Sequence, residues 1–211
     1  MTKEAQRRLE GGLLIAFEGI DGSGKSTQAR RFADWVEARG YEVVRSREPT
    51  DGPWGKKIRA ARFTERLSPE DELNAFVEDR KEHVATLIKP ALQRGAVVVI
   101  DRYYYSTAAY QGARGLDPKA LLALNRAFAP RPHVVVLVDV EPKLSVQRIA
   151  ARGEGQDLFE TLDALTKVRD AFLSIREPHV VTIDGSGSPD TVFAAVLSAI
   201  RERTPLGVEP A

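Results

Sequence analysis

Five short apolar runs rich in β-branched residues recur along the chain, separated by longer segments that are polar on one side. They lie at residues 13–17, 42–45, 97–100, 134–138 and 180–183. The last three are almost continuous in valine and isoleucine, which is typical of strands buried on both faces of a parallel sheet. The pattern therefore predicts five strands that are joined by longer connections.

The segments between these runs show helical periodicity. The segment 27–39 places Phe32, Trp35 and Val36 on one face, which predicts an amphipathic helix. Similar patterns occupy 118–128 (with Leu121, Leu122, Leu124 and Phe128), 142–152, 161–175 and 191–200. The long connection at about 53–95 is expected to contain two helices. Strands that alternate with helices predict a three-layer α/β fold, with a five-stranded parallel sheet and helices on both faces.

Composition narrows the classes of function. The 211 residues carry 31 Lys and Arg against 30 Asp and Glu, and this near balance favours neither nucleic acid nor a membrane surface as a partner. Cysteine is absent, which excludes disulfides, thiolate metal sites and cysteine nucleophiles. No apolar run is long enough for a signal sequence or a membrane span, so we expect a cytoplasmic protein. The length suits one domain, with a core at about 13–203 and loose flanks at 1–10 and 204–211.

A glycine-rich segment at 19–26 fits the pattern G-x-x-x-x-G-K-[ST] in full, between a predicted strand and a predicted helix. Glycines allow several backbone N–H groups to point at one phosphate, and the helix N-terminus adds positive charge. Lys25 is placed to reach the β- and γ-phosphates of ATP, and Ser26 to bind Mg2+. The predicted ATP-binding residues are Gly19, Ile20, Asp21, Gly22, Ser23, Gly24, Lys25, Ser26 and Thr27.

The third predicted strand ends in Asp101-Arg102-Tyr103. At the carboxyl end of a parallel strand, Asp101 lies at the ligand crevice, where it can hold Mg2+ or its waters. Arg102 beside it can bind a second phosphate in bidentate fashion. The Asn-Lys-x-Asp motif of GTPases and the Leu-Ser-Gly-Gly-Gln motif of transport ATPases do not occur in the chain. The pattern favours a kinase with a small phosphorylated acceptor.

An ordered set of further motifs follows along the chain. It comprises Phe17 to Gln28 around the loop, Arg47-Glu48-Pro49, Phe76-Val77-Glu78-Asp79-Arg80, Asp101-Arg102-Tyr103, Ser106, Ala109-Tyr110-Gln111-Gly112 and Asp157-Leu158-Phe159-Glu160. This set resembles the thymidylate kinase family, from Leu13 to about Arg203. The resemblance implies a P-loop NTPase-type fold with a short lid at about 148–160. It also implies transfer of the γ-phosphoryl group of ATP to dTMP, giving dTDP and ADP in dTTP synthesis, with Mg2+.

The resemblance implies a dTMP pocket as well. Phe76 and Arg80 are four residues apart, so one helix face presents both. In the family the ring stacks on thymine and the arginine hydrogen-bonds a base carbonyl. Arg102 is implied to hold the dTMP phosphate, Asp21 to approach the sugar 3′-hydroxyl, and Tyr103 to crowd the 2′ position. The implied dTMP-binding residues are Asp21, Glu48, Pro49, Phe76, Arg80, Arg102, Tyr103, Thr107, Tyr110 and Gln111.

Family members place a catalytic arginine either in the phosphate loop or on the lid. This loop has none, so the resemblance implies a lid arginine. Arg148 and Arg152 are four residues apart on the helix that leads into the lid, and one is expected along adenine and one at the phosphates. Leu158 stands where the family often has an arginine. The implied catalytic residues are Lys25, Arg102, Arg148 and Arg152, with Arg148 also binding ATP and with Ser26 and Asp101 as Mg2+ ligands.

The resemblance further implies a homodimer formed through helices, with ATP and dTMP as partners and neither nucleic acid nor membrane. Two alternatives stay open. One is a related kinase that phosphorylates another deoxynucleotide or a deoxynucleoside, since the base-reading position near Thr107 varies in the family. The other is a nucleotide-binding regulator without phosphoryl transfer, against which the intact Lys25, Asp101 and Arg102 argue.

Overall fold

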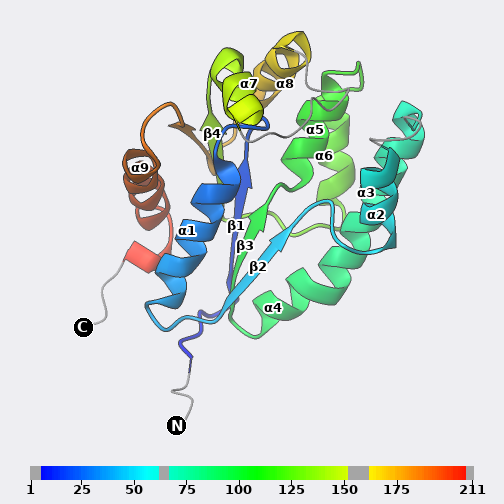
Figure 1. The fold of residues 1–211 in the computed structure, drawn as a ribbon. Coiled ribbons are helices and arrows are strands. Elements are labelled where there is room, and N and C mark those ends of the chain that lie inside the picture. Colours follow the sequence, from blue (N-terminus) through cyan, green and yellow to red (C-terminus); the bar gives the residue numbers. More distant parts are fainter. Residues whose placement is uncertain (1–5, 62–66, 152–161, 208–211) are drawn as a thin grey trace.

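The computed structural model describes residues 6–61, 67–151 and 162–207. Five parallel strands form one sheet in the order β2-β3-β1-β4-β5 (Figure 1). Their bounds are β1 (Leu13–Glu18), β2 (Val43–Arg47), β3 (Val97–Asp101), β4 (Val134–Asp139) and β5 (Val180–Asp184). Each lies within two residues of the strand predicted from an apolar run, so the predicted five-stranded parallel sheet is confirmed.

The three central strands are buried along almost their whole length. All of β1 is buried, and only the last residues of β3 and β4, Asp101 and Asp139, are partly exposed. Helices cover both faces here, which explains the continuous apolar runs. The prediction that the run 180–183 is buried on both faces is wrong. It forms β5 at an edge of the sheet, where Thr182 is exposed and Val180 is half-buried.

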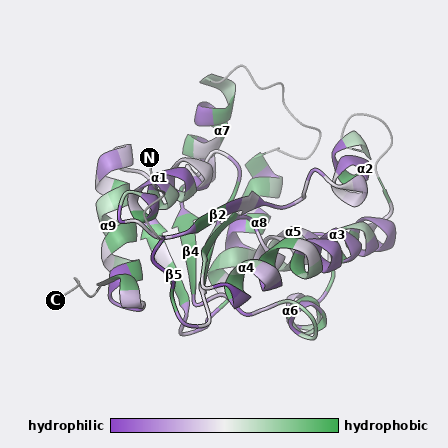
Figure 2. Cartoon of the chain, turned by 90° about the horizontal axis from the view of Figure 1, so that it is seen from below, coloured by the Kyte–Doolittle hydropathy of each residue, from purple (hydrophilic) through white to green (hydrophobic). Residues whose placement is uncertain are grey.

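Successive residues of β1 point to opposite faces of the sheet, and each face carries its own hydrophobic core. On one face, Ile15 and Phe17 pack with apolar residues of α1 (Lys25–Glu37) and α9 (Pro189–Arg201). On the other face, Leu14 packs in a second core. The elements that complete this core are η1 (Val84–Ile88), α4 (Lys89–Gln93), α5 (Tyr104–Gly112), α6 (Pro118–Arg126) and α8 (Leu162–Ser174). In Figure 2 the central strand β4 is hydrophobic, the edge strand β2 is largely hydrophilic, and the surrounding helices carry hydrophilic residues.

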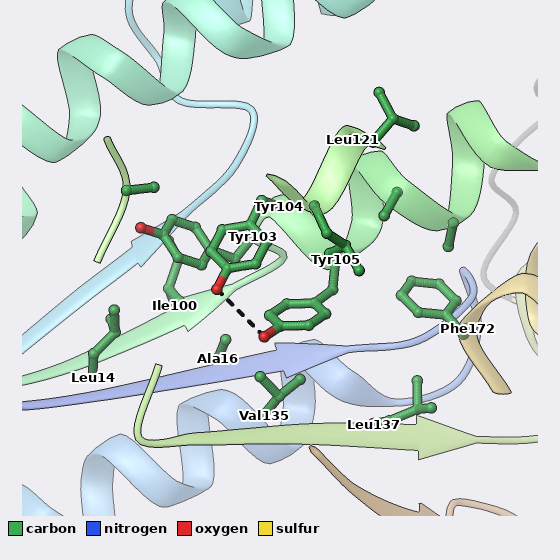
Figure 3. Close-up of a cluster of buried hydrophobic side chains, with 14 of the residues drawn as sticks. Leu14, Ala16, Ile100, Tyr103, Tyr104, Tyr105, Leu121, Val135, Leu137 and Phe172 are labelled. Carbon is green, nitrogen blue, oxygen red and sulfur yellow. Dashed lines mark hydrogen bonds between the residues drawn. The ribbon is translucent and has the colours of Figure 1, made fainter. Parts of the chain in front are cut away.

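Three consecutive tyrosines at the start of α5 fill the second core (Figure 3). Tyr103, Tyr104 and Tyr105 are each at most 1% exposed, and the centroids of neighbouring rings lie 4.7 and 4.5 Å apart. Residues 104–109 are all buried, so the first part of α5 has no polar face. For this reason the hydrophobic periodicity does not predict this helix. Its burial anchors the preceding residue pair, Asp101 and Arg102, against the sheet.

The long connection between β2 and β3 contains more helices than the predicted two. Its elements are α2 (Pro53–Ala61), α3 (Pro69–His83), η1 and α4. The start of α3 follows from its sequence, because Oγ of Ser68 accepts a 3.1 Å hydrogen bond from the backbone N of Asp71 and Pro69 fits the first turn. The prediction of two helices is wrong because the chain changes to π-helical geometry at Val84 and then returns to α-helix.

The other predicted helices are confirmed to within two residues at each end. They are α1, α6, α7 (Pro142–Ala151), α8 and α9. Leu124, which was expected in the apolar pattern of α6, is instead 45% exposed. The lid expected at about 148–160 begins within α7, and its residues from 152 onward lie outside the described residues. Within the described ranges, no helix combines the length and apolar character needed to cross a membrane.

Candidate nucleotide-binding site

The phosphate loop joins β1 to α1, and its glycines take conformations that other residues rarely adopt. Gly22 has a φ of 77° and Gly24 a φ of 95°. A Cβ atom at Gly22 would lie 2.6 Å from the carbonyl oxygen of Ser145, and one at Gly19 would lie 2.4 Å from that of Val138. The loop is thus packed closely against α7 and β4, and only glycine fits both positions.

Lys25, the first residue of α1, extends its side chain back across the loop. Its Nζ donates to the carbonyl oxygen of Ile20 at 3.3 Å and to Oδ1 of Asp21 at 3.1 Å. Burial lowers the pKa of Lys25, and the positive charge of Arg102 lowers it further, while Asp21 and Asp101 oppose both effects. A bound phosphate would supply negative charge to this buried ammonium group.

Arg102 follows β3 and links the loop to α5. It has a φ of 66° and is the one non-glycine residue in the described part of the chain with a positive φ. Its Nη1 donates to the carbonyl oxygen of Gly19 at 3.4 Å and to Oγ of Ser106 at 3.2 Å. Its Nη2 donates to the hydroxyl of Tyr110 at 3.2 Å and to the carboxylate of Asp21. The guanidinium therefore lies where the loop meets α5.

Glu18, which the motifs did not predict as a site residue, supports this arrangement from the core. It is 0% exposed. Its Oε1 accepts from the backbone N of Tyr103 at 2.8 Å and of Ser106 at 3.3 Å, and its Oε2 accepts from Oγ of Ser106 at 2.5 Å. Burial raises the pKa of Glu18 to about 7, although the hydrogen bond from Ser106 opposes the rise. Its only sequence signal is a carboxylate at the end of a buried strand, directly before the phosphate loop.

Asp101 and Ser26 line one cavity of about 580 Å³, which is bordered by residues of α1, β2, α3 and η1. Oδ1 of Asp101 is buried and has no hydrogen-bond partner among the described residues. A carboxylate oxygen of this kind beside a hydroxyl suits Mg2+, which takes oxygen ligands and keeps several waters. The described ranges contain no group of three or more His, Cys, Asp or Glu that could hold a metal. Phosphate oxygens and water would therefore have to complete the coordination.

Arg80 on α3 is 1% exposed and lies at the centre of a buried polar network. Its Nε and Nη2 lie 2.8 and 2.6 Å from Oε2 of Glu48. Its Nη1 donates to Oδ1 of Asn125 at 2.5 Å, and its Nη2 to Oγ1 of Thr107 at 3.1 Å. Oε1 of Glu48 lies 2.9 Å from Nδ1 of His83. The structure thus brings the predicted residues Arg80, Glu48 and Thr107 together and adds Asn125 and His83.

Two more of the residues predicted for the acceptor flank this network. Phe76, one turn before Arg80, is half-buried and belongs to neither hydrophobic core. Gln111, one turn after Thr107 on α5, donates from Nε2 to Oε2 of Glu72 at 2.7 Å. The carboxylate can only accept, so the orientation of this amide is settled. Oε1 of Gln111 is buried and without a partner in the described part of the chain.

The two tyrosines predicted at the acceptor occupy different environments. The Tyr110 hydroxyl lies 3.2 Å from Nη2 of Arg102, and its ring centroid lies 5.0 Å from the guanidinium carbon of that arginine. Tyr103 is 0% exposed, and its hydroxyl donates to the carbonyl oxygen of Pro130 at 3.3 Å. The guanidinium carbon of Arg80 lies 5.5 Å from the Tyr103 ring centroid. The structure thus places the Tyr103 ring in the core and the Tyr110 hydroxyl beside Arg102.

The Arg-Glu-Pro motif and the Phe-x-x-Asp-Arg motif form one structural unit. Asp79 accepts from the backbone N and the Oγ1 of Thr50 at 2.8 and 2.6 Å. Its neighbour Arg80 pairs with Glu48. Two successive residues of α3 thereby hold the chain on both sides of Pro49, whose peptide bond with Glu48 is cis. The two motifs are thereby joined in space, across 29 positions between Thr50 and Asp79 and 32 positions between Glu48 and Arg80.

Arg148 on α7 contacts the opposite side of the phosphate loop. Its Nη1 lies 3.5 and 3.4 Å from the carbonyl oxygens of Gly22 and Ser23, and its Nη2 donates to that of Gly185 at 3.0 Å. A second cavity, of about 390 Å³, opens here and is lined by Gly22, Ser23, Gly24, Thr27, Gln28, Arg148 and residues of the β5–α9 connection. Its place beside the loop suits the nucleoside part of a nucleotide. Arg152, the other predicted lid arginine, lies outside the described residues.

Comparisons with known proteins agree on one family. A family model described as thymidylate kinase matches residues 17–196. A thymidylate kinase of Xylella fastidiosa (strain M12) is 48% identical over 191 residues, covering 90% of this chain and 88% of the relative. One of Xanthomonas oryzae pv. oryzae (strain PXO99A) is 49% identical over 197 residues, covering 92% and 86%. The crystal structure of thymidylate kinase from Ehrlichia chaffeensis matches with a TM-score of 0.72 and 30% identity, covering 90% of this chain and 99% of that one.

Proposed function

Because this chain belongs to the thymidylate kinase family, it transfers the γ-phosphoryl group of ATP to dTMP, and we propose that the residues around Arg102 carry the reaction. The supporting observation is that Arg102 contacts both Gly19 of the phosphate loop and Ser106 of α5. One cation thereby lies between the place of the donor phosphates and the place of the acceptor phosphate. The products are dTDP and ADP, and the reaction is a step in dTTP synthesis.

On the donor side, we propose that residues 19–27 bind the phosphates of ATP. Phosphoryl transfer needs little covalent chemistry from the protein, so alignment and neutralisation of charge dominate. Lys25 would exchange its contact with Asp21 for the β- and γ-phosphates. Arg148 would lie along the nucleoside in the second cavity or reach the phosphates. Arg152 would take the other of these two roles as the second lid arginine.

On the acceptor side, the polar groups left over in the buried network suit thymine. Among the described residues, one N–H on Nη1 of Arg80 and the buried Oε1 of Gln111 have no partner. Both adjoin Thr107, which contacts Arg80 and lies one turn from Gln111. Thymine presents a carbonyl acceptor next to an N–H donor and would satisfy both groups. Cytosine presents the opposite pattern and would leave both unpaired, which costs binding free energy.

The rest of the acceptor would be held by neighbouring residues. Phe76 would stack on the base, Arg102 would bind the phosphate, and Asp21 would approach the 3′-hydroxyl. We assign the sugar contact to Tyr110, because its hydroxyl lies beside Arg102. Glu48, with Pro49 next to it, acts by holding Arg80 in place. The expected role of Tyr103 becomes support of Arg80 from within the core.

The metal in this proposal is Mg2+, held by Ser26 and Asp101 together with nucleotide phosphates and water. The support is the unpartnered, buried Oδ1 of Asp101 in the cavity that Ser26 also lines. When bound, Mg2+ would neutralise the charge that develops on the transferred phosphoryl group. Asp101 would orient the ion or its waters, and Ser26 would fix it at the start of α1.

We also propose that the chain works as one nucleoside monophosphate kinase domain, with a core at about 13–203 and a lid at about 148–160. The continuity of one sheet through β1, β3 and β4 supports a single domain. A homodimer formed through helices and a cytoplasmic location are proposed from family membership. ATP and dTMP are the partners in this proposal, and neither nucleic acid nor a membrane takes part.

The test is an acceptor panel with coupled detection of ADP. Purified protein is given ATP, Mg2+ and, in turn, dTMP, dUMP, dCMP, dGMP, dAMP and thymidine. The expected result is that dTMP gives the highest kcat/KM and that dCMP gives little ADP above background. If dTMP gave no ADP while another acceptor did, the chain would be a related kinase that phosphorylates that other deoxynucleotide or deoxynucleoside. If no acceptor gave ADP although nucleotides bound, the regulator would be supported.

A further inference from the structure

Asn125 is a buried polar residue outside the motifs, and it contacts the proposed base-reading arginine. It lies on α6 and is 0% exposed. Its Oδ1 lies 2.5 Å from Nη1 of Arg80, which belongs to α3, 45 positions earlier in the chain. Burying a polar amide costs free energy unless it is fully hydrogen-bonded, so its presence in this core requires a reason.

The hydrogen bonds settle the orientation of the Asn125 amide. Its Nδ2 donates to the carbonyl oxygen of Leu121 at 2.8 Å, within α6. A carbonyl oxygen cannot donate, so the Nδ2 end must face Leu121 and the Oδ1 end must face Arg80. The amide is therefore a fixed acceptor held by its own helix.

The donors of Arg80 can be counted one by one. A guanidinium carries five N–H groups. Nε donates to Glu48, Nη2 donates to Thr107 and also lies 2.6 Å from Oε2 of Glu48, and one N–H of Nη1 donates to Asn125. Among the described residues, one N–H of Nη1 has no partner. Asn125 occupies the other N–H of this same nitrogen, so it decides in which direction the remaining one points.

We propose that Asn125 is a positioning residue for base selection, which aims the last free N–H of Arg80 at the acceptor base. The inference rests on the proposed function, in which Arg80 reads a base carbonyl. Glu48 holds the guanidinium along one edge and Asn125 holds it at Nη1, so rotation of the side chain is blocked. A single N–H held in a fixed direction can donate to a carbonyl oxygen but not to an amino group, which is itself a donor. Asn125 thereby contributes to the choice of thymine without touching the nucleotide.

The experiment compares dTMP with 5-methyl-dCMP, which replaces one base carbonyl by an amino group, removes the proton from the adjacent ring nitrogen and keeps the methyl group. The measured quantity is the ratio of kcat/KM for the two acceptors, in wild type and in Asn125→Leu, which is similar in size but has no acceptor oxygen. The ratio is expected to fall about tenfold or more, mainly through a higher KM for dTMP, because the free N–H loses its fixed direction. Asn125→Ser, with a shorter side chain, serves as a second variant should the leucine variant fold poorly, and the same fall is expected.

Two controls separate positioning from general support of the fold. Asn125→Asp loses the donor to Leu121 but keeps an oxygen opposite Nη1 of Arg80 and adds a charge that strengthens this contact, so its ratio is expected to stay within about threefold of wild type. Leu122→Ala shortens a buried apolar side chain of the same helix, one that cannot hydrogen-bond Arg80, and it should lower thermal stability while leaving the ratio unchanged. A ratio that falls equally in Leu122→Ala and Asn125→Leu would overturn the inference, because loosening of α6 would then explain both.

A further variant distinguishes failure of this inference from failure of the proposed function. Arg80→Met combined with Glu48→Gln removes the arginine and leaves no unpaired buried carboxylate. If this double variant keeps the wild-type ratio, Arg80 does not read the base and the proposed function of that residue fails together with the inference. If the ratio of kcat/KM values falls in the double variant but stays at the wild-type value in both Asn125→Leu and Asn125→Ser, the proposed function stands and the role proposed for Asn125 is wrong.

Discussion

The carboxylate of Glu18 on β1 accepts a 2.5 Å hydrogen bond from Oγ of Ser106 on α5, although the two residues are 88 positions apart. The same carboxylate accepts from the backbone N of Ser106 and of Tyr103. These bonds satisfy donors at the N-terminus of α5 that would otherwise be buried without partners. The contact fixes the start of α5 directly after Arg102, so one buried acid supports the residue proposed to bind the acceptor phosphate.

This relationship predicts a pH-dependent stability. Burial raises the pKa of Glu18 to about 7 in the folded protein, against 4.5 for an exposed glutamate. The folded protein therefore holds a proton that the unfolded chain releases, so the contribution of Glu18 to stability is complete below pH 4.5 and is lost as pH rises to 7. Glu18→Gln removes this titration. The unfolding free energy of wild type minus that of the variant should fall by about 3 kcal/mol from pH 4.5 to 8.

Urea denaturation across that pH range measures the difference. Glu10→Gln, at an exposed glutamate near the N-terminus, is the matched control and should give curves parallel to wild type. Parallel curves for Glu18→Gln as well would show that Glu18 does not titrate in this range in the folded protein.

Lys25→Ala is predicted to separate binding from transfer. The Lys25 ammonium lies among loop oxygens, where it would meet the β- and γ-phosphates. Its removal should lower the rate of transfer of labelled γ-phosphate in a single turnover by about 10²-fold or more, because a charge placed for the transition state is lost. Affinity for dTMP, measured by calorimetry without ATP, should change little. Equal rates in wild type and variant would contradict this role.

The contacts within one segment can be predicted from sequence, whereas those between distant segments cannot. The phosphate loop is predictable because all its chemistry lies in eight contiguous positions between a strand and a helix. Arg102 is predictable because it follows a buried strand. Glu18 and Asn125 are not, since each acts through a partner brought near only by the packing of α5 or α6.

Helices show the same division. A helix with one apolar face, such as α1, can be recognised in the sequence because its buried positions recur every three or four residues. The start of α5 is buried on all sides and has no such periodicity, and so neither this helix nor the full burial of Tyr103 is predictable. The family motif marks Tyr103 without telling whether its ring serves the ligand or the core, and the fold places it in the core.

Two single-hydroxyl variants test the reassignment of the tyrosines. Tyr110→Phe removes the hydroxyl 3.2 Å from Nη2 of Arg102 and should raise the KM for dTMP about two- to tenfold, the usual effect of one lost hydrogen bond. Tyr103→Phe loses only the bond to Pro130 and should leave the KM for dTMP unchanged. Its preference for dTMP over ribothymidine monophosphate should also stay at the wild-type value. A loss of that preference in Tyr103→Phe would instead support the expectation that Tyr103 crowds the 2′ position of the sugar.

Arg102→Lys is predicted to weaken binding of the acceptor dTMP more than binding of the donor ATP. Lysine keeps the charge but loses the fork, in which Nη1 contacts Ser106 and Nη2 contacts Tyr110. The KM for dTMP should rise about 10- to 100-fold, since charge-assisted hydrogen bonds to the phosphate are lost, while the KM for ATP changes much less. Steady-state kinetics with each substrate varied in turn measure this, and Arg201→Lys on the exposed end of α9 is the control. An equal rise in both KM values would place Arg102 between the substrates without preference for dTMP.

Asp101→Asn is predicted to change the metal requirement. Oδ1 of Asp101 is buried without a partner in the described ranges, an arrangement that favours a bound cation or its waters over an empty pocket. The variant keeps the shape of the side chain but removes its negative charge. The Mg2+ concentration that gives half-maximal rate should therefore rise about tenfold, and saturating Mg2+ should recover much of the rate. Ser26→Ala should raise the Mg2+ requirement in the same direction, whereas Ser46→Ala, in the same cavity but on β2, should not. A wild-type Mg2+ profile in Asp101→Asn would mean that the carboxylate holds the Arg102 segment instead of the metal.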